Sequence, residues 1–330
     1  MRLGYSAPLD GIPLGEHAAL ARDAAALGYT DCWSLEMAAS DAFLPLAVSA
    51  AACDGLRYGT AIASVFARGP ALMATNAAQL AELAPGRFVL GIGTSSDIIV
   101  ERWNGIPFEK PYTRLAETLD FLQAALAGER AGGFRLPNPP AQKVPIILGS
   151  MRPRALRLAG AKADGIVVNL VPPDALHHLL APVHEGAREA GRSTDGLEVV
   201  QRVLVALGSP EEAERAARRW VIAYAQVEVY RTFFHAIGIG EALEPAVEAF
   251  LAGRRDEAVE LLPLDVVRQL VLWGSWEEIR AGLAAHGAAG VTTSALYFLS
   301  LAADPAEKAR LQREALERLA PLPVASILEP

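Results

Sequence analysis

Short apolar segments typical of buried strands alternate with helical segments along almost the whole chain. This alternation predicts a parallel sheet covered by helices. Eight strand–helix units is also the number that closes a (β/α)8, or TIM, barrel. An open, doubly wound sheet is the alternative, but the near-uniform repeat favours closure. The expected strands are residues 2–6, 31–35, 56–64, 87–91, 144–148, 165–168, 197–207 and 291–297.

One segment breaks this repeat. Residues 211–276 contain several helical stretches before the last expected strand, and they are rich in aromatic side chains. We expect a single domain over residues 1–330, in which residues 211–276 form a mostly helical insertion that covers the barrel mouth. Segments at that position commonly determine which substrate an enzyme accepts.

Composition excludes several classes of function. Hydrophobic residues make up 52% of the chain and charged residues 21%, which indicates a large buried core. The net charge of -8, without a basic stripe, argues against nucleic acid or an anionic membrane as a partner. Two cysteines, Cys32 and Cys53, are too few for a disulfide framework or a metal cage. We therefore expect no metal site. The first residues lack a secretion signal, so we expect a cytoplasmic protein.

The apolar run before residue 94 ends in the sequence Gly91-Ile92-Gly93, followed by the polar residues Thr94-Ser95-Ser96-Asp97. Glycines at a strand end allow a ligand to approach the backbone, and the polar residues are suited to capping a helix, with Asp97 as the expected cap. Free N–H groups at a helix start favour an anion such as phosphate. A dinucleotide-binding motif is disfavoured, because its third glycine is absent.

A second turn of this kind follows the fifth expected strand. Gly149, Ser150, Met151 and Arg152 come just before a helix, and they combine backbone donors, a hydroxyl group and a fixed positive charge. Such a turn suits a phosphate. Its alternative is an ordinary strand-to-helix turn with solvated arginines.

Three stretches carry a resemblance to a known family: RFVLGIG (87–93), WNGIPF (103–108) with Arg114 and Glu117 after it, and LAG (158–160) with ADG (163–165). In these stretches the chain resembles the luciferase-like monooxygenase superfamily. It is most similar to the branch that uses coenzyme F420, a deazaflavin, and that includes methylenetetrahydromethanopterin reductase. The resemblance implies hydride transfer between F420 and a small organic substrate, and a homodimer or higher homo-oligomer.

The resemblance also implies roles for individual residues. The loop at 149–152 would bind the cofactor phosphate, and a cis peptide bond between Ala61 and Ile62 would support the deazaflavin ring. The expected cofactor-binding residues are Ser6, Ala61, Ile62, Ser64, Gly93, Thr94, Ser95, Gly149, Ser150, Met151 and Arg152.

Glu36 is the expected catalytic residue, because it occupies the place where relatives carry an acidic residue beside the ring. A partly buried carboxyl group there could act as an acid or base. The alternative is a loop carboxylate with no part in catalysis, with Asp41 as the cap of the next helix. Some relatives have a histidine after the acidic residue, whereas this chain has Met37.

Two other functions stay open at this stage. An FMN-dependent luciferase-like monooxygenase would use the same barrel with reduced flavin and oxygen. A non-catalytic flavin- or deazaflavin-binding barrel is also compatible with the sequence, because no strong acid–base pair is visible in it.

Overall fold

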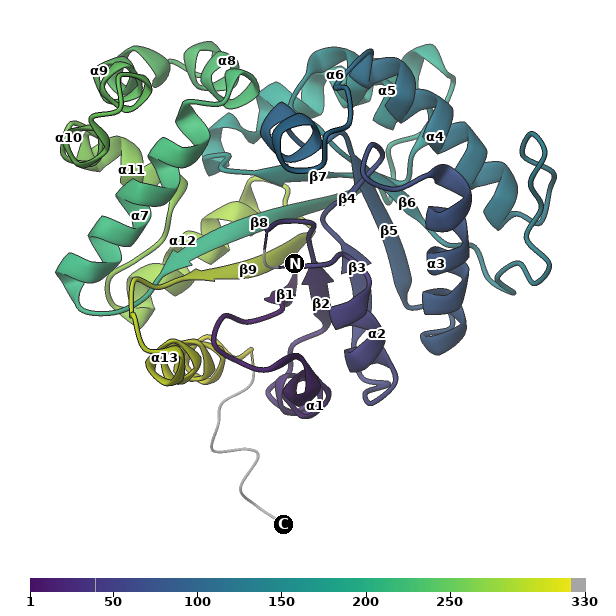
Figure 1. Ribbon diagram of the computed structural model, residues 1–330, viewed down its shortest axis with the longest axis horizontal. Helices are drawn as coiled ribbons and strands as arrows, with labels where there is room; N and C mark the ends of the chain where they lie inside the picture. Colours follow the sequence, from purple (N-terminus) through teal and green to yellow (C-terminus); the bar gives the residue numbers. More distant parts are fainter. Residues whose placement is uncertain (39, 322–330) are drawn as a thin grey trace.

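The computed structural model describes residues 1–38 and 40–321, and its strands form one closed parallel sheet (Figure 1). The strand order is β3-β2-β1-β9-β8-β7-β6-β5-β4, and a pairing of β3 with β5 closes the ring. Because β3 and β4 are two parts of one side, the sheet is an eight-sided TIM barrel, as predicted. The strands are β1 (Arg2–Ala7), β2 (Asp31–Ser34), β3 (Arg57–Thr60), β4 (Ala63–Ser64), β5 (Phe88–Gly93), β6 (Ile146–Gly149), β7 (Gly165–Asn169), β8 (Glu198–Ala206) and β9 (Thr293–Leu299).

Helices surround the barrel and connect its strands (Figure 1). Several begin with a proline in the first turn, where its missing N–H costs no hydrogen bond. No helix in the described ranges is long and apolar enough to cross a membrane. The outer elements are η1 (Leu14–Glu16), α1 (His17–Ala26), α2 (Leu44–Ala50), α3 (Pro70–Leu83), η2 (Ile98–Trp103), α4 (Pro111–Leu126), α5 (Pro153–Lys162), η3 (Pro173–Ala175), α6 (Leu176–Glu189), α12 (Trp276–Ala288) and α13 (Pro305–Arg318).

Five further helices lie between β8 and α12, and Figure 1 shows them grouped on one side of the barrel beside β8 and β9. They are α7 (Pro210–Ala225), α8 (Glu228–Ala236), α9 (Gly240–Leu251), α10 (Arg255–Glu260) and α11 (Leu264–Leu270). Ser209 caps α7 by accepting the Glu212 N–H, and the Glu212 side chain accepts the Ser209 N–H in return. The sequence therefore marks the start of this helical segment with a strong local signal.

Each expected strand overlaps an observed one, with ends shifted by at most two residues, and two of the expected strands differ most. The third, expected over 56–64, is divided into β3 and β4, because residues 61–62 between them form a bend that bonds to the end of β2 and to Glu36. Ala61 donates to the Ser34 carbonyl at 2.6 Å, and the Ile62 carbonyl accepts from Glu36 at 3.2 Å. The last strand is Thr293–Leu299 rather than 291–297, since α12 and its turn extend further along the chain than expected.

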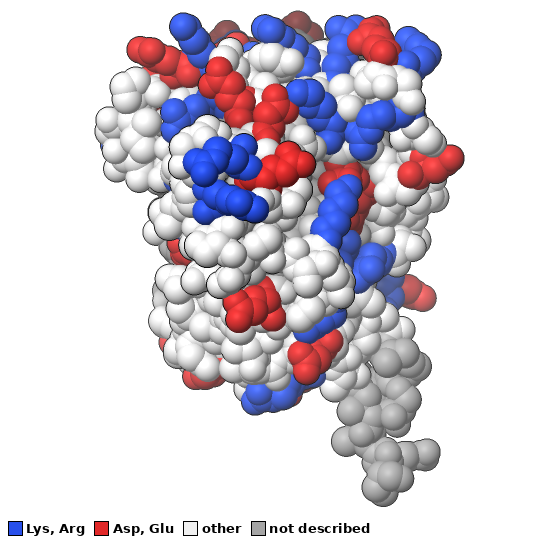
Figure 2. Space-filling model, turned by 90° about the vertical axis from the view of Figure 1, so that its right-hand side faces the viewer, with Lys and Arg blue, Asp and Glu red and all other residues white. Residues whose placement is uncertain are grey.

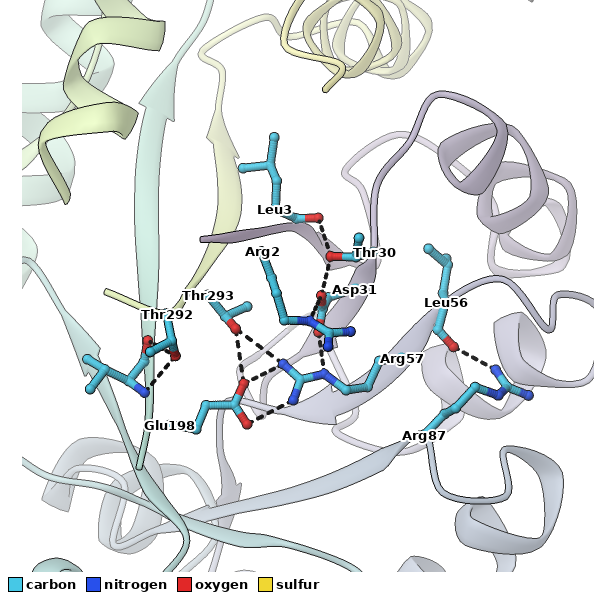
Figure 3. A network of polar contacts seen from close by, with 11 residues as sticks. Arg2, Leu3, Thr30, Asp31, Leu56, Arg57, Arg87, Glu198, Thr292 and Thr293 are labelled. Carbon is cyan, nitrogen blue, oxygen red and sulfur yellow. Dashed lines mark hydrogen bonds and ion pairs between the residues drawn. The ribbon is translucent and has the colours of Figure 1, made fainter. Parts of the chain in front are cut away.

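The amino ends of the strands enclose a polar network (Figure 3). Arg57 donates to Asp31 at 2.5 Å and to Glu198 at 2.8 Å, and Thr293 donates to Glu198 at 3.0 Å. Burial opposes the charge of Arg57, but its bonds to Glu198 and Asp31 prevail, and its pKa is raised. An apolar layer lies above this network, so the amino end is closed. That layer consists of Trp33, Val89, Ile147, Val167, Val200 and Ala295.

Candidate functional site

The two loops predicted to hold a phosphate lie side by side at the carboxyl ends of β5 and β6. Gly93 pairs with Gly149 in the sheet, which places residues 94–96 next to residues 150–152. The backbone N–H groups of Thr94, Ser95, Ser150 and Met151 make no hydrogen bond within the part of the chain that the structure describes. Neighbouring free donors of this kind suit an anion.

The glycines beneath these loops have a packing role that the sequence did not indicate. A Cβ atom on Gly149 would lie 2.5 Å from Cγ2 of Ile62, and one on Gly93 would lie 3.0 Å from Cγ1 of the same side chain. A Cβ atom on Gly91 would lie 1.9 Å from the Thr60 carbonyl oxygen. A side chain does not fit at these three positions, because Thr60 and Ile62 occupy the space next to them.

The helix cap expected at Asp97 is wrong. The Asp97 side chain makes no capping hydrogen bond to η2. Instead, the Ser96 hydroxyl accepts the Ile99 N–H at 3.3 Å. Ser95 has a positive φ of 61°, so the chain turns sharply one residue before Ser96.

Arg152 lies at the rim of the same loop pair. Its side chain is 58% exposed, and its guanidinium is 3.6 Å from the Glu228 carboxylate on α8. The Ser150 hydroxyl accepts the Arg152 N–H at 3.1 Å, which fixes the turn and leaves the hydroxyl proton free to be donated. The loop thus combines free donors with a positive charge that is partly neutralised by an acidic neighbour.

The bend between β3 and β4 is the third feature of this end of the barrel. The peptide bond between Ala61 and Ile62 is cis, as the resemblance implies. Both residues are partly buried, whereas Ser64 is fully buried and its hydroxyl accepts the Phe66 and Ala67 N–H groups at 3.3 Å. Ser6, on β1, is 3% exposed, and strand alternation points it into the barrel.

Glu36 is held by polar partners on both of its oxygens. Oε2 accepts the Ser64 N–H at 2.6 Å, and Oε1 pairs with Arg68. Arg68 also pairs with Asp41, whose Oδ1 accepts the Phe43 and Leu44 N–H groups at 2.7 Å. Asp41 thus binds the start of α2 as expected of a cap, although the N-cap residue itself is Phe43. Burial opposes the Arg68 charge, but the two carboxylates raise its pKa. This arrangement suits an ionised carboxylate that fixes the β3–β4 bend.

A second polar cluster, which the sequence analysis missed, lies on the opposite side of the barrel mouth. Arg202 on β8 donates from Nε to Asn169 at 3.1 Å and from Nη2 to the Tyr224 hydroxyl at 2.7 Å. Asn169 donates to the Tyr230 hydroxyl at 3.1 Å. An arginine inside the apolar stretch 197–207 was the available signal, since a charged residue in a buried strand requires a partner.

Charges on the outer surface are mixed. Figure 2 shows lysine and arginine side chains interspersed with acidic ones on the face it presents, with uncharged surface between the groups. Within residues 1–38 and 40–321, no cluster of His, Cys, Asp and Glu is suited to hold a metal ion. Mixed surface charge of this kind leaves recognition of an anionic ligand to local donors.

Comparison with known proteins places this geometry in context. The family model described as "Luciferase-like monooxygenase" matches residues 1–293. A Mycobacterium tuberculosis protein provisionally named a coenzyme F420-dependent oxidoreductase is 29% identical over 324 residues, covering 88% of this chain and 93% of that protein.

Two solved structures share the fold across nearly the whole chain. The coenzyme F420-dependent tetrahydromethanopterin reductase of Methanopyrus kandleri gives a TM-score of 0.79 at 20% identity, covering 99% of this chain and 100% of that one. The oxygenating constituent of 3,6-diketocamphane monooxygenase from Pseudomonas putida, solved with FMN, gives 0.65 at 20% identity, covering 100% and 99%.

Proposed function

The chain belongs to the luciferase-like monooxygenase family, and we propose that it is an F420-dependent oxidoreductase. In this proposal it transfers a hydride between the deazaflavin and a small organic substrate at the carboxyl end of the barrel. Enzymes with this fold place their sites at that end. The Mycobacterium tuberculosis relative, which matches 88% of this chain and 93% of its own length, is named for the same cofactor.

The observation that carries the proposal is the pair of loops after β5 and β6. Their free N–H groups at residues 94–95 and 150–151, with Arg152 at the rim, fit the phosphate of a flavin or deazaflavin cofactor. The acidic neighbour Glu228 limits how much charge Arg152 contributes. Most of the recognition in this proposal therefore comes from backbone donors, which carry no counter-charge of their own.

When bound, the deazaflavin supplies the hydride chemistry. The residues of this chain then bind and orient the cofactor and the substrate, and they shield both from water. Glu36 and Arg68 hold the β3–β4 bend in place through the Ser64 N–H, so they support whatever packs on that bend. Trp33 and its apolar neighbours close the barrel beneath the site and exclude water from below.

Equilibrium titration with F420 and, separately, with FMN tests the proposal. We expect fluorescence changes that report F420 binding at about micromolar concentration or tighter, with FMN at least ~10-fold weaker. Tight FMN binding without F420 binding would support the FMN-dependent monooxygenase instead. If F420 binds, the protein is better described as a non-catalytic binding barrel when two absorbances stay constant: that of oxidised F420 with a panel of alcohols, and that of reduced F420 with aldehydes, enones and unsaturated carboxylic acids.

A further inference from the structure

Arg202 is a buried cation without a carboxylate partner. It is 7% exposed and lies on the inward-facing side of β8. No acidic side chain forms an ion pair with it in the described ranges, where its bonded partners are Asn169 and Tyr224. Buried charges are normally paired, because an isolated charge in a protein interior is costly. This position therefore lacks the anion that such a charge requires.

The tyrosines around Arg202 do not supply that anion. The guanidinium lies 5.2 Å from the ring centre of Tyr297 and 5.7 Å from that of Tyr224. Burial raises the pKa of both Tyr230 and Tyr297 to about 12, so these phenols stay neutral at physiological pH. Ring faces attract the cation only weakly compared with a carboxylate.

The cluster offers donors rather than acceptors. The Tyr224 and Tyr230 hydroxyl oxygens already accept hydrogen bonds, so their protons point elsewhere. Nη1 of Arg202 donates to no residue that the structure describes. Independently, Nε1 of Trp220 is buried without a partner in the described chain, and its ring packs at a tilt against Tyr224 and Tyr297, with ring centres 5.8 and 5.3 Å apart. Several unmatched donors around one fixed positive charge are complementary to an anion.

The position of the cluster indicates which molecule brings the anion. In the strand order, β8 is separated from β3 by β2, β1 and β9 on one side and by β5, β6 and β7 on the other. Arg202 thus lies across the barrel mouth from the bend at residues 61–62. The phosphate-type loops follow β5 and β6, and β7 lies between β6 and β8. A molecule between that bend and Arg202 would occupy the place of the substrate rather than that of the cofactor phosphate.

We propose that Arg202, with the hydroxyl groups of Tyr224 and Tyr230, binds a carboxylate group of the substrate, so that the enzyme acts on small organic acids. This inference rests on the proposed function for the position of the cofactor. A planar carboxylate matches the two-pronged donor geometry of a guanidinium. The aromatic side chains of Trp220 and Tyr297 favour an unsaturated or aromatic body attached to that carboxylate.

Calorimetric titration with benzoate and with benzamide tests the inference, because the two probes differ mainly in charge. In the F420-loaded protein we expect benzoate to bind at least ~10-fold more tightly than benzamide. Arg202→Met should weaken benzoate binding roughly 10- to 100-fold and remove the preference. Tyr224→Phe should weaken benzoate less, and Arg310→Met, a surface control on α13, should change nothing.

The outcomes separate this inference from the proposed function. Equal binding of benzoate and benzamide by the unmodified protein, or full benzoate binding by Arg202→Met, would overturn the inference. Loss of F420 affinity in Arg202→Met with unchanged benzoate binding would assign the arginine to the cofactor and also overturn it. Benzoate binding that depends on Arg202 in a protein that binds no F420 would support the anion site while contradicting the proposed function. If Arg202→Met does not fold, Arg202→Lys and Tyr224→Phe must both weaken benzoate binding for the inference to stand.

Discussion

Two arginines at opposite ends of the same barrel, one partly buried and one buried, have contrasting surroundings. Arg57, at the amino end, binds two carboxylates and a threonine, and Figure 3 shows these groups directed toward one another. Arg202, at the carboxyl end, binds an amide and a phenol and has no ion-pair partner in the described chain. The charges of the amino-end network are thus paired. The carboxyl end instead has hydrogen-bond donors and a positive charge without a counter-ion in the described chain. This contrast assigns stability to one end and binding to the other.

The largest expected effect tests the contrast through stability. Arg57→Met leaves the buried Asp31 and the partly buried Glu198 carboxylates without their shared partner and should lower the free energy of unfolding by about 3 kcal/mol or more. Arg202→Met removes a charge that lacks a counter-ion and should cost less than about 1 kcal/mol, or even stabilise the fold. Urea unfolding measures both. An equal loss in the two variants would break the comparison.

The next effect concerns Glu36, within the binding end. If it holds the β3–β4 bend, Glu36→Gln should reduce turnover by ~10²-fold, because small misplacements at a reacting centre are costly. Arg68→Met, which releases the Glu36 carboxylate, should then cause a similar loss, and neither should alter the shape of the pH–rate profile. Steady-state rates across pH distinguish the roles. Retained turnover in Arg68→Met beside an inactive Glu36→Gln would make Glu36 an acid or base instead.

A third prediction sharpens the description of the closed end. Burial lowers the pKa of His286 to about 4, and this residue lies at the end of α12, just before β9. The unfolded chain therefore takes up a proton below about pH 6.5 that the folded protein refuses until about pH 4, so stability falls with falling pH across that range. His286→Leu removes this term. Between pH 7 and pH 5, the free energy of unfolding of this variant should fall by about 2 kcal/mol less than that of the unmodified protein. Urea unfolding at both pH values measures the difference. Parallel pH dependences would contradict the assignment.

The smallest effect is expected at the exposed rim of the binding end. Arg152→Ala should weaken F420 binding roughly tenfold, about 1.4 kcal/mol, because its charge is largely solvated and is shared with Glu228. Glu228→Gln is the matched variant and should strengthen binding slightly. Fluorescence titration of both variants with F420 checks the direction of each change in affinity. Unchanged affinity in Arg152→Ala would leave recognition of the phosphate to backbone donors alone.

Local sequence patterns predicted features built from short stretches of chain better than contacts between distant residues. The barrel, the loop after Gly149, the hydrogen bonds of Asp41 to the start of α2 and the position of the bend at residues 61–62 all depend on short stretches of chain or on the family resemblance. The two arginine clusters join residues far apart in sequence, such as Arg57 with Glu198 and Arg202 with Tyr224. Spacing along the chain does not reveal such pairs, although a charged residue in a buried strand does indicate that a partner must exist.

The central claim is that a deazaflavin binds at the carboxyl end of the barrel while the amino end stays closed. Amide hydrogen exchange with and without F420 tests this most directly. We predict added protection at residues 61–66, 93–97 and 149–152, and none at the strand starts near Asp31, Arg57 and Glu198. Protection confined to the amino end, or no protection at the three carboxyl-end loops with F420 bound, would contradict it.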